Sequence, residues 1–173
     1  MDINGMSNRM YFLPDHVDFY STNSSESLAE DLSHNIGEIL KQSIKSDGRA
    51  SLAVSGGRTP IPLLEALSDL KLDWSSVDLT LVDDRWVEPF HKDSNEMLVR
   101  AHLIKNKAKK INFVPLKNNS KTAKGGYKLS EESLQQVKSP FDVVVLGVGS
   151  DGHTASLFPC SDELTEGMSL NNP

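Results

Sequence analysis

Residues 51–60 read SLAVSGGRTP, and the expected fold follows from this stretch. Its first four residues form a short, mostly apolar run, which is typical of a buried strand. The glycine pair that comes next permits a tight turn. Thr59 and Pro60 then match the start of a helix, with Thr59 as the N-cap and Pro60 as the first helical residue. The stretch therefore predicts a strand, a glycine turn and a helix that runs to about Leu70.

The sequence before this stretch predicts a long helix. Apolar residues recur at spacings of three and four over residues 28–44, which places them on one helical face. Ser24 or Ser25 is expected to be the N-cap, and Gly48 is expected to end the helix. A short strand is also expected over residues 10–13.

The sequence after it continues the alternation of strands and helices. The expected elements are strands over residues 78–82, 112–116 and 141–146, helices over residues 95–104 (capped by Asp93 or Ser94) and 129–137, and a polar loop over residues 117–126. Such alternation is typical of right-handed β-α-β units, so the predicted fold class is α/β: a Rossmann-like, doubly wound, mostly parallel sheet with helices on both faces. The segment FDVVVL at 141–146 is almost wholly apolar and predicts a central strand covered on both faces.

Length and composition favour one domain. We expect a single α/β domain over residues 10–173, preceded by a flexible tail over residues 1–9. Lys and Arg number 18 and Asp and Glu number 24, so the net charge is −6, which argues against a nucleic-acid-binding protein. The single cysteine excludes an intramolecular disulfide. With no signal peptide and no apolar stretch of about 18 residues in view, we expect a cytoplasmic protein without membrane contact, as a monomer or weak homodimer.

Three strand ends carry unusual residues, and they should lie near one another, because ligands of open α/β sheets bind at the carboxyl ends of the strands. At the first of them, Gly56 and Gly57 let the backbone approach a ligand closely. The helix behind them points its free N–H groups and the positive end of its dipole at the loop, which suits a phosphate. The P-loop spacing is absent, and a plain β-α turn would use the same glycines.

The second strand end reads DDRW at residues 83–86. Three charged residues directly after a buried strand are costly if they are buried and unpaired. One interpretation is a solvated turn with an Asp–Arg pair. The other gives Arg85 to an anionic or carbonyl oxygen of a ligand, with a carboxylate to orient the guanidinium.

The third strand end reads GVGSDGHT at residues 147–154. It matches the dinucleotide motif G-x-G-x-x-G, but it lies near the end of the chain, no acidic-ended strand follows, and the next helix meets Pro159 within two turns. Val148 stands where a nucleophile elbow needs glycine. Asp151, two residues before His153 on a glycine-bent loop, is suited to orient the imidazole as a general base. The alternative is a structural or merely exposed histidine.

Together, the three segments resemble the 6-phosphogluconolactonase family. Its motifs are a Ser-Gly-Gly-x-Thr-Pro loop, an Asp-(Glu/Asp)-Arg-Trp-Val segment followed by Ser-Asn, and a Gly-x-Gly-x-Asp-Gly-His-Thr-Ala-Ser-Leu-Phe-Pro run. They match residues 55–60, 83–87 with 94–95, and 147–159, in order and spacing. Glucosamine-6-phosphate deaminases of the same superfamily typically read Asp-Glu-Tyr and Asp-Gly-His-Ile-Ala-Phe-Asn, so this sequence favours the lactonase branch. Family members continue for some tens of residues further, so the resemblance implies a missing C-terminal part.

The resemblance implies a carboxylic ester hydrolase that converts 6-phospho-D-glucono-1,5-lactone to 6-phosphogluconate in the oxidative pentose phosphate pathway. His153 would activate water, and Asp151 would hold its tautomer. Arg85, oriented by Asp83, would stabilise the oxyanion or hold the phosphate. The residues implied in substrate or phosphate binding are Ser55, Gly56, Gly57, Arg58, Thr59, Asp83 and Gly149. No metal or organic cofactor is expected. The alternatives are a glucosamine-6-phosphate deaminase or isomerase, and a sugar-phosphate-binding module that is inactive through truncation.

Overall fold

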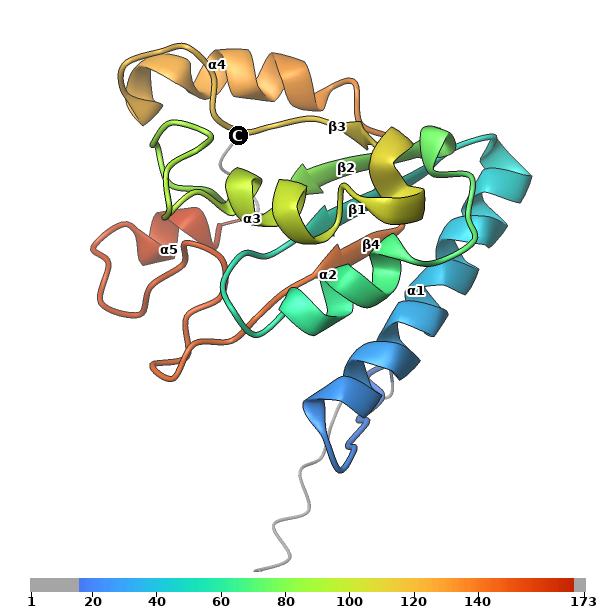
Figure 1. Cartoon of the computed structure of the whole chain (residues 1–173). Helices are drawn as coiled ribbons and strands as arrows, with labels where there is room; N and C mark the ends of the chain where they lie inside the picture. Colours follow the sequence, from blue (N-terminus) through green and yellow to red (C-terminus); the bar gives the residue numbers. More distant parts are fainter. Residues whose placement is uncertain (1–15, 170–173) are drawn as a thin grey trace, which may run out of the picture.

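The computed structural model describes residues 16–169, which form a sheet with helices around it (Figure 1). The elements in chain order are α1 (Ser25–Asp47), β1 (Ala50–Val54), α2 (Ile61–Ser68), the 3-10 helix η1 (Trp74–Ser76), β2 (Val77–Leu81), α3 (Asn95–His102), the 3-10 helix η2 (Asn106–Lys110), β3 (Asn112–Phe113), α4 (Ala123–Leu134), β4 (Val143–Val145) and α5 (Leu164–Gly167). The strand expected at 10–13 and the tail expected at 1–9 lie outside the described residues. None of the described helices is both long enough and apolar enough to cross a bilayer.

The sheet has the strand order β3-β2-β1-β4, and every pair is parallel. The chain steps outward from β1 to β2 and β3 and then returns to place β4 on the other side of β1 (Figure 1). This reversal is the mark of a doubly wound sheet, and it puts the topological switch point between β1 and β4. The predicted α/β class is confirmed.

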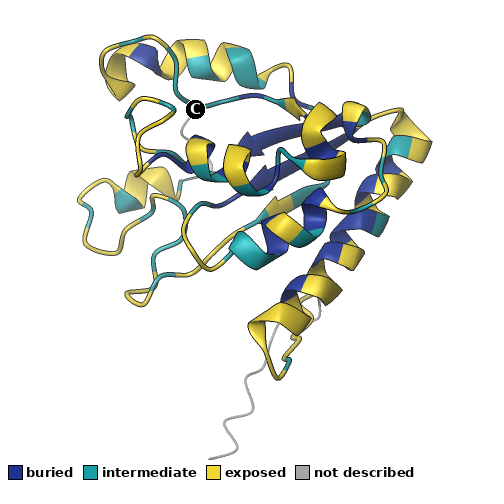
Figure 2. Ribbon diagram, viewed as in Figure 1, coloured by how far each residue is buried: buried dark blue, intermediate teal, exposed yellow. Residues whose placement is uncertain are grey.

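The core is built on β1 and β2, whose residues are all buried (Figure 2). Helix α1 packs against α2, and α2 packs against α3. The largest fully buried side chains are Trp74, Leu40, Leu52, Leu64, Leu67, Leu79 and Leu103. Burial of apolar side chains on this scale is the main force that stabilises the fold.

Local signals in the sequence fix the ends of the first helix. The Ser24 side chain accepts a hydrogen bond of 3.1 Å from the Ser27 N–H, as an N-cap does. Gly48 has a φ of 77° and closes the helix in the left-handed conformation that glycine adopts without strain. Both predictions at this helix are confirmed.

Helix α4 begins earlier than predicted. Thr122 is its N-cap and accepts a hydrogen bond of 3.1 Å from the Gly125 N–H, so residues 123–126 are helical and the expected loop is shorter. The glycines are tolerated because Gly126 packs against the indole of Trp86, where a Cβ would overlap the ring. Tertiary packing therefore overrides the weak helix propensity of glycine.

Within residues 16–169, strand β4 lies at the edge of the sheet, whereas its apolar sequence predicts a central strand. It pairs with β1 alone, and no strand within residues 16–169 lies on its other side. Val144 is 47% exposed and Leu146 is 56% exposed. A continuous apolar run shows that a segment suits a buried sheet, but its place in the strand order depends on how the chain returns from β3.

Strand β3 is also shorter than the expected 112–116. Its pairing with β2 reaches one residue further through the Val114 N–H, which donates to the Leu79 carbonyl at 2.8 Å. Pro115 follows directly, and proline within a sheet is confined to edge strands and strand ends.

Asp142, the residue before β4, connects this strand to the core through hydrogen bonds. Its Oδ2 accepts a hydrogen bond of 2.7 Å from the backbone N–H of Ser51, a fully buried residue of β1. Its Oδ1 accepts from Ser43 at 2.8 Å and from the Lys138 ammonium at 2.6 Å. Burial alone would raise the pKa of Asp142, but the hydrogen bonds from Lys138, Ser43 and Ser51 outweigh it and lower that pKa. The ionised carboxylate therefore stabilises the fold at neutral pH, and this contribution is lost as the pH falls through the lowered pKa.

We expect Asp142→Ala to lower the free energy of unfolding by about 2–3 kcal/mol at pH 7, because it leaves the buried Ser51 N–H without an acceptor. Asp47 is the matched control. It pairs with the same Lys138 ammonium at 2.8 Å, but its side chain is half exposed. Asp47→Ala should therefore cost much less than Asp142→Ala. Urea unfolding of both variants measures the difference, and equal losses would contradict this account of β4.

Candidate active site

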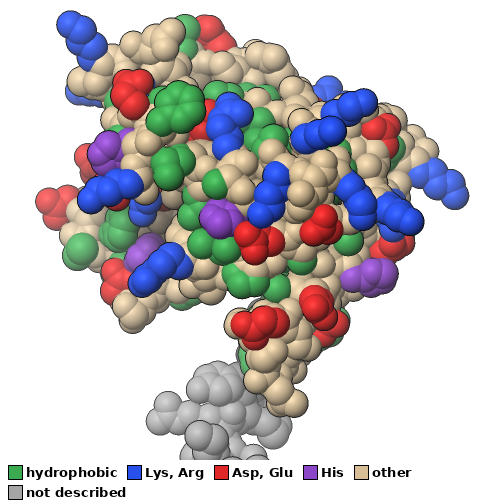
Figure 3. Space-filling model, viewed as in Figure 1, with side chains coloured by type: hydrophobic (Ala, Val, Ile, Leu, Met, Phe, Trp, Pro, Cys, Tyr) green, Lys and Arg blue, Asp and Glu red, His purple; other side chains and the backbone are tan. Residues whose placement is uncertain are grey.

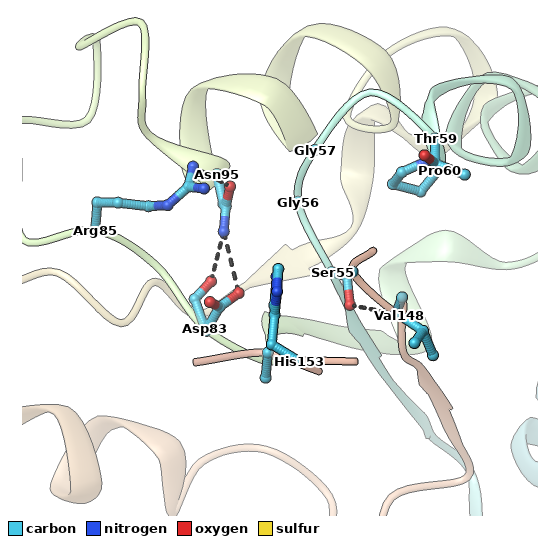
Figure 4. A pocket seen from close by; sticks show the side chains of 13 residues that line it. Ser55, Gly56, Gly57, Thr59, Pro60, Asp83, Arg85, Asn95, Val148 and His153 are labelled. Atoms are coloured by element: carbon cyan, nitrogen blue, oxygen red, sulfur yellow. Dashed lines mark hydrogen bonds between the residues drawn. The ribbon is translucent and has the colours of Figure 1, made fainter. Parts of the chain in front are cut away.

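A cleft opens where the loops after β1, β2 and β4 meet, at the switch point of the sheet (Figure 4). Its volume is about 220 Å³, which suits a small metabolite rather than a macromolecule. The residues that line it are Ser55, Gly56, Gly57, Thr59, Pro60, Asp83, Arg85, Asn95, Gly147, Val148, Gly149, His153 and Ala155. The three strand ends singled out in the sequence thus lie together, as predicted from the rule for parallel sheets.

The glycine loop after β1 presents unused backbone donors to the cleft. Within residues 16–169, the N–H groups of Gly56, Gly57, Arg58 and Thr59 donate to no acceptor. Gly57 has a φ of 91°, which side-chain-bearing residues rarely adopt, so the glycine is required by the turn. Free N–H groups just before a helix form a site that favours anions.

Thr59 is not the N-cap that the sequence predicts. Pro60 is the N-cap of α2 and has helical dihedral angles, so the helix starts one residue later. The Thr59 side chain makes no capping bond and lines the cleft instead. Arg58 is exposed and is not among the lining residues.

Ser55 joins two of the loops. Its hydroxyl donates to the Val145 carbonyl at 2.9 Å and accepts from the Gly147 N–H at 3.2 Å. Both hydrogen bonds connect the end of β1 to the end of β4. The hydroxyl of Ser55 is therefore engaged in holding the cleft together.

The two acidic residues after β2, Asp83 and Asp84, make different contacts. Asp84 caps α3, because its carboxylate accepts from the N–H of Asn95 at 2.7 Å and from the N–H of Glu96 at 3.2 Å. Ser94 is the N-cap residue, as predicted, and accepts from the Met97 N–H at 3.3 Å. Asp83 faces the cleft instead. Asp84 thus has a structural role, and only its neighbour belongs to the site.

Asp83 does not orient Arg85 directly, contrary to the expectation from the sequence. Asn95 lies between them: its Oδ1 accepts from Arg85 Nη1 at 3.2 Å, and its Nδ2 donates to Asp83 Oδ1 at 3.2 Å (Figure 4). Arg85 Nη1 also donates to the Asp93 carbonyl at 2.9 Å. Asn95 was missed as a site residue, and its place in the resembled motif after Ser94 was the only signal for it.

The loop after β4 carries the histidine. His153 Nδ1 lies 2.5 Å from Asp151 Oδ1, and the same oxygen accepts from the His153 backbone N–H at 3.2 Å. The hydrogen bond from the ring, followed by the one from the backbone, lowers the pKa of Asp151. An ionised carboxylate only accepts hydrogen bonds, so in the neutral imidazole Nδ1 carries the proton and Nε2 keeps its lone pair.

Packing holds the imidazole in place. The Phe158 ring lies 4.6 Å from it, centroid to centroid. Gly149 lies against the ring on a tight turn, and a Cβ there would overlap the imidazole. Figure 4 shows the imidazole rising into the cleft between Asp83 and Ser55. Asp151 itself is half exposed and does not line the cleft.

The G-x-G-x-x-G run is not followed by the helix that a dinucleotide site uses. Gly152 has a φ of 88°, and the chain after it forms a small turn closed by a bridge between Thr154 and Leu157. The next helix, α5, starts only at Leu164. Of the glycines in this loop, Gly149 packs against the imidazole of His153.

Fold and cleft together define the class: an α/β protein with a ligand site at the switch point of a doubly wound sheet. The chain belongs to the family described as glucosamine-6-phosphate isomerases/6-phosphogluconolactonase, whose model matches residues 23–171. The resemblance drawn from the three motifs is therefore confirmed.

Several of the similar proteins are named 6-phosphogluconolactonase. The chain is 41% identical over 156 residues to a 6-phosphogluconolactonase of Pseudomonas aeruginosa, covering 90% of this chain and 66% of the relative. It is 44% identical to that of Rhizobium meliloti, covering 84% and 63%. A crystal structure of a 6-phosphogluconolactonase from Shewanella baltica OS155 matches with a TM-score of 0.88 and 44% identity, covering 91% and 68%. The chain spans about two thirds of the length of the curated relatives it matches.

Proposed function

We propose that this chain hydrolyses 6-phospho-D-glucono-1,5-lactone to 6-phosphogluconate. The observation that carries the proposal is the juxtaposition in one cleft of His153, Arg85 and the free N–H groups of the glycine loop. These groups match the two ends of the substrate, an ester carbonyl and a phosphate. The similar lactonases support the same reaction.

His153 is the general base of the proposed mechanism. Its Nε2 takes a proton from water while the water oxygen attacks C1 of the lactone. The tetrahedral intermediate then collapses, the bond from C1 to the ring oxygen breaks, and the imidazolium returns the proton to that oxygen. Asp151 holds the ring through Nδ1 and stabilises the imidazolium. Such a base contributes about 10²–10⁴-fold to the rate.

The glycine loop and Arg85 provide the two groups of the cleft that can contact the phosphate and the oxyanion that forms at C1. The N–H groups of residues 56–59 hold the phosphate at the positive end of α2. Arg85 supplies a positive charge from the loop after β2, beside Asn95 (Figure 4). It stabilises either the oxyanion at C1 or the phosphate, and the kinetics of Arg85→Ala separate the two roles.

A paired assay tests the function against its alternatives. Supplied with 6-phosphogluconolactone generated in situ, the chain should form 6-phosphogluconate faster than the spontaneous reaction does. Supplied with glucosamine 6-phosphate, it should release no ammonia. Ammonia release without lactone hydrolysis would favour a deaminase. Binding of 6-phosphogluconate in a calorimeter without turnover would favour a binding module.

A further inference from the structure

Asn95 lines the cleft and forms hydrogen bonds to both Arg85 and Asp83. It is the first residue of α3 and only 3% exposed. We propose that Asn95 is the positioning residue of this site, which aims Arg85 without neutralising its charge. The proposal rests on the proposed function for its kinetic readout, but its geometry is independent of the reaction.

The chemistry of the partners fixes how the amide of Asn95 is turned. Arg85 only donates hydrogen bonds, so it faces Oδ1. The carbonyl and carboxylate of Asp83 only accept, so they face Nδ2, at 2.9 Å and 3.2 Å. The backbone of Asn95 is held as well, because its N–H donates to Asp84 at 2.7 Å. The amide therefore has one orientation, and Arg85 has a fixed acceptor.

The same amide contacts the glycine loop. A Cβ at Gly56 would overlap the Oδ1, Cγ and Nδ2 atoms of Asn95, so the loop backbone lies directly against the amide. Asp83 carries the connection further, because its Oδ2 accepts from Ser156 Oγ at 2.7 Å, on the loop that bears the histidine. Asn95 and Asp83 together tie all three loops to one another.

A neutral amide has an advantage over a carboxylate at this position. A carboxylate against Arg85 would form an ion pair and cancel much of the positive charge that an anionic substrate needs. Within residues 16–169, Arg85 makes no ion pair with an acidic side chain. The neutral amide of Asn95 accepts a hydrogen bond from the guanidinium, so the positive charge of Arg85 remains available to an anionic ligand.

Two substitutions separate this role from a structural one. Asn95→Asp keeps the shape and the acceptor for Arg85 but adds a negative charge and replaces the Nδ2 donor to Asp83 with an acceptor, whereas Asn95→Ala removes the side chain and leaves a hollow. If Asn95 only filled space, Asp would be tolerated better than Ala. We expect the reverse order: kcat/KM for the lactone and affinity for 6-phosphogluconate fall by about tenfold or more in Asn95→Ala, because Arg85 is misplaced, and fall further in Asn95→Asp.

A double-mutant cycle tests whether Asn95 acts through Arg85. In the Arg85→Ala background, Asn95→Ala should lower kcat/KM much less than it does in the unaltered chain. Ser94→Ala is the matched control, because it removes the cap of the same helix without touching Arg85, and it should leave kcat/KM per folded molecule unchanged. Equal effects of Asn95→Ala in both backgrounds, or an Asp variant as active as the Ala variant, would overturn the proposal.

A spectroscopic readout keeps this test separate from the proposed function. The Nε–H signal of Arg85 in a nitrogen–proton NMR spectrum should shift in Asn95→Ala and stay in place in Ser94→Ala. An unshifted signal would overturn the positioning role even in an active enzyme. A chain with no lactonase activity but with the expected shift would instead reject the proposed function and retain the role of Asn95.

Discussion

Alanine in place of His153 is expected to lower the rate of lactone hydrolysis by about 10²–10⁴-fold, the contribution of a positioned general base. Affinity for 6-phosphogluconate should stay close to that of the unaltered chain, because the glycine loop and Arg85 remain in place. Stopped assays coupled to 6-phosphogluconate oxidation measure the rate, and calorimetry measures the affinity. The rate falls because no other described side chain in the cleft offers a neutral nitrogen with a free lone pair.

His102 provides a matched control for this variant. Its Nδ1 lies 3.0 Å from Glu65 Oε1, so it too is a histidine paired with a carboxylate, but it lies on α3 and does not line the cleft. His102→Ala should leave the rate unchanged. An equal loss of turnover and product affinity in His153→Ala would count against its role as a base and favour a binding role.

The second large effect is expected for Arg85→Ala, which should lower kcat/KM by about 10²-fold, the usual cost of removing one donor that stabilises a developing anion. A fall confined to kcat would assign Arg85 to the oxyanion at C1. A rise confined to KM would assign it to the phosphate. Steady-state kinetics of the variant make the assignment.

Arg58→Ala is the comparison for this prediction. Arg58 belongs to the glycine loop, but its side chain is exposed and does not line the cleft. Its loss should therefore cost much less than the loss of Arg85. The opposite ranking would show that the main contact to the anion comes from the arginine of the glycine loop.

Features that depend on neighbours in the sequence could be predicted well. Ser24, Gly48 and Ser94 act through backbone groups within a few residues, so their capping roles follow from local chemistry alone. The gathering of three loops at one edge also follows from the alternation of strands and helices, because parallel strands end on the same side. These two kinds of inference placed His153, Arg85 and the glycine loop in one cleft.

Features that depend on contacts between distant segments could not be predicted. The early start of α4 depends on the contact between Gly126 and Trp86, which are 40 positions apart by their residue numbers. The pairing of β4 with β1 depends on the order of strands, which an apolar run does not encode. Asn95 looked like an ordinary first residue of a helix, since its link from Arg85 to Asp83 exists only in three dimensions.

Thr59 was predicted to be a helix cap, but in the structure it lines the cleft instead. A threonine before a proline is a good helix cap by sequence, but the cap would consume the hydroxyl. In the structure Pro60 is the N-cap and the helix begins at Ile61, so Thr59 lines the cleft beside unused N–H groups. The departure from the local rule occurs at the candidate site, where such departures are most often found.

In the proposed mechanism His153, held by Asp151, activates water for attack on a phosphorylated lactone. The most direct measurement compares the unaltered chain with His153→Ala in one coupled assay, at the same pH and lactone concentration, after subtraction of the spontaneous rate. We expect hydrolysis above background in the unaltered chain and a rate near background in the variant. Hydrolysis that persists at an equal rate in both would contradict it.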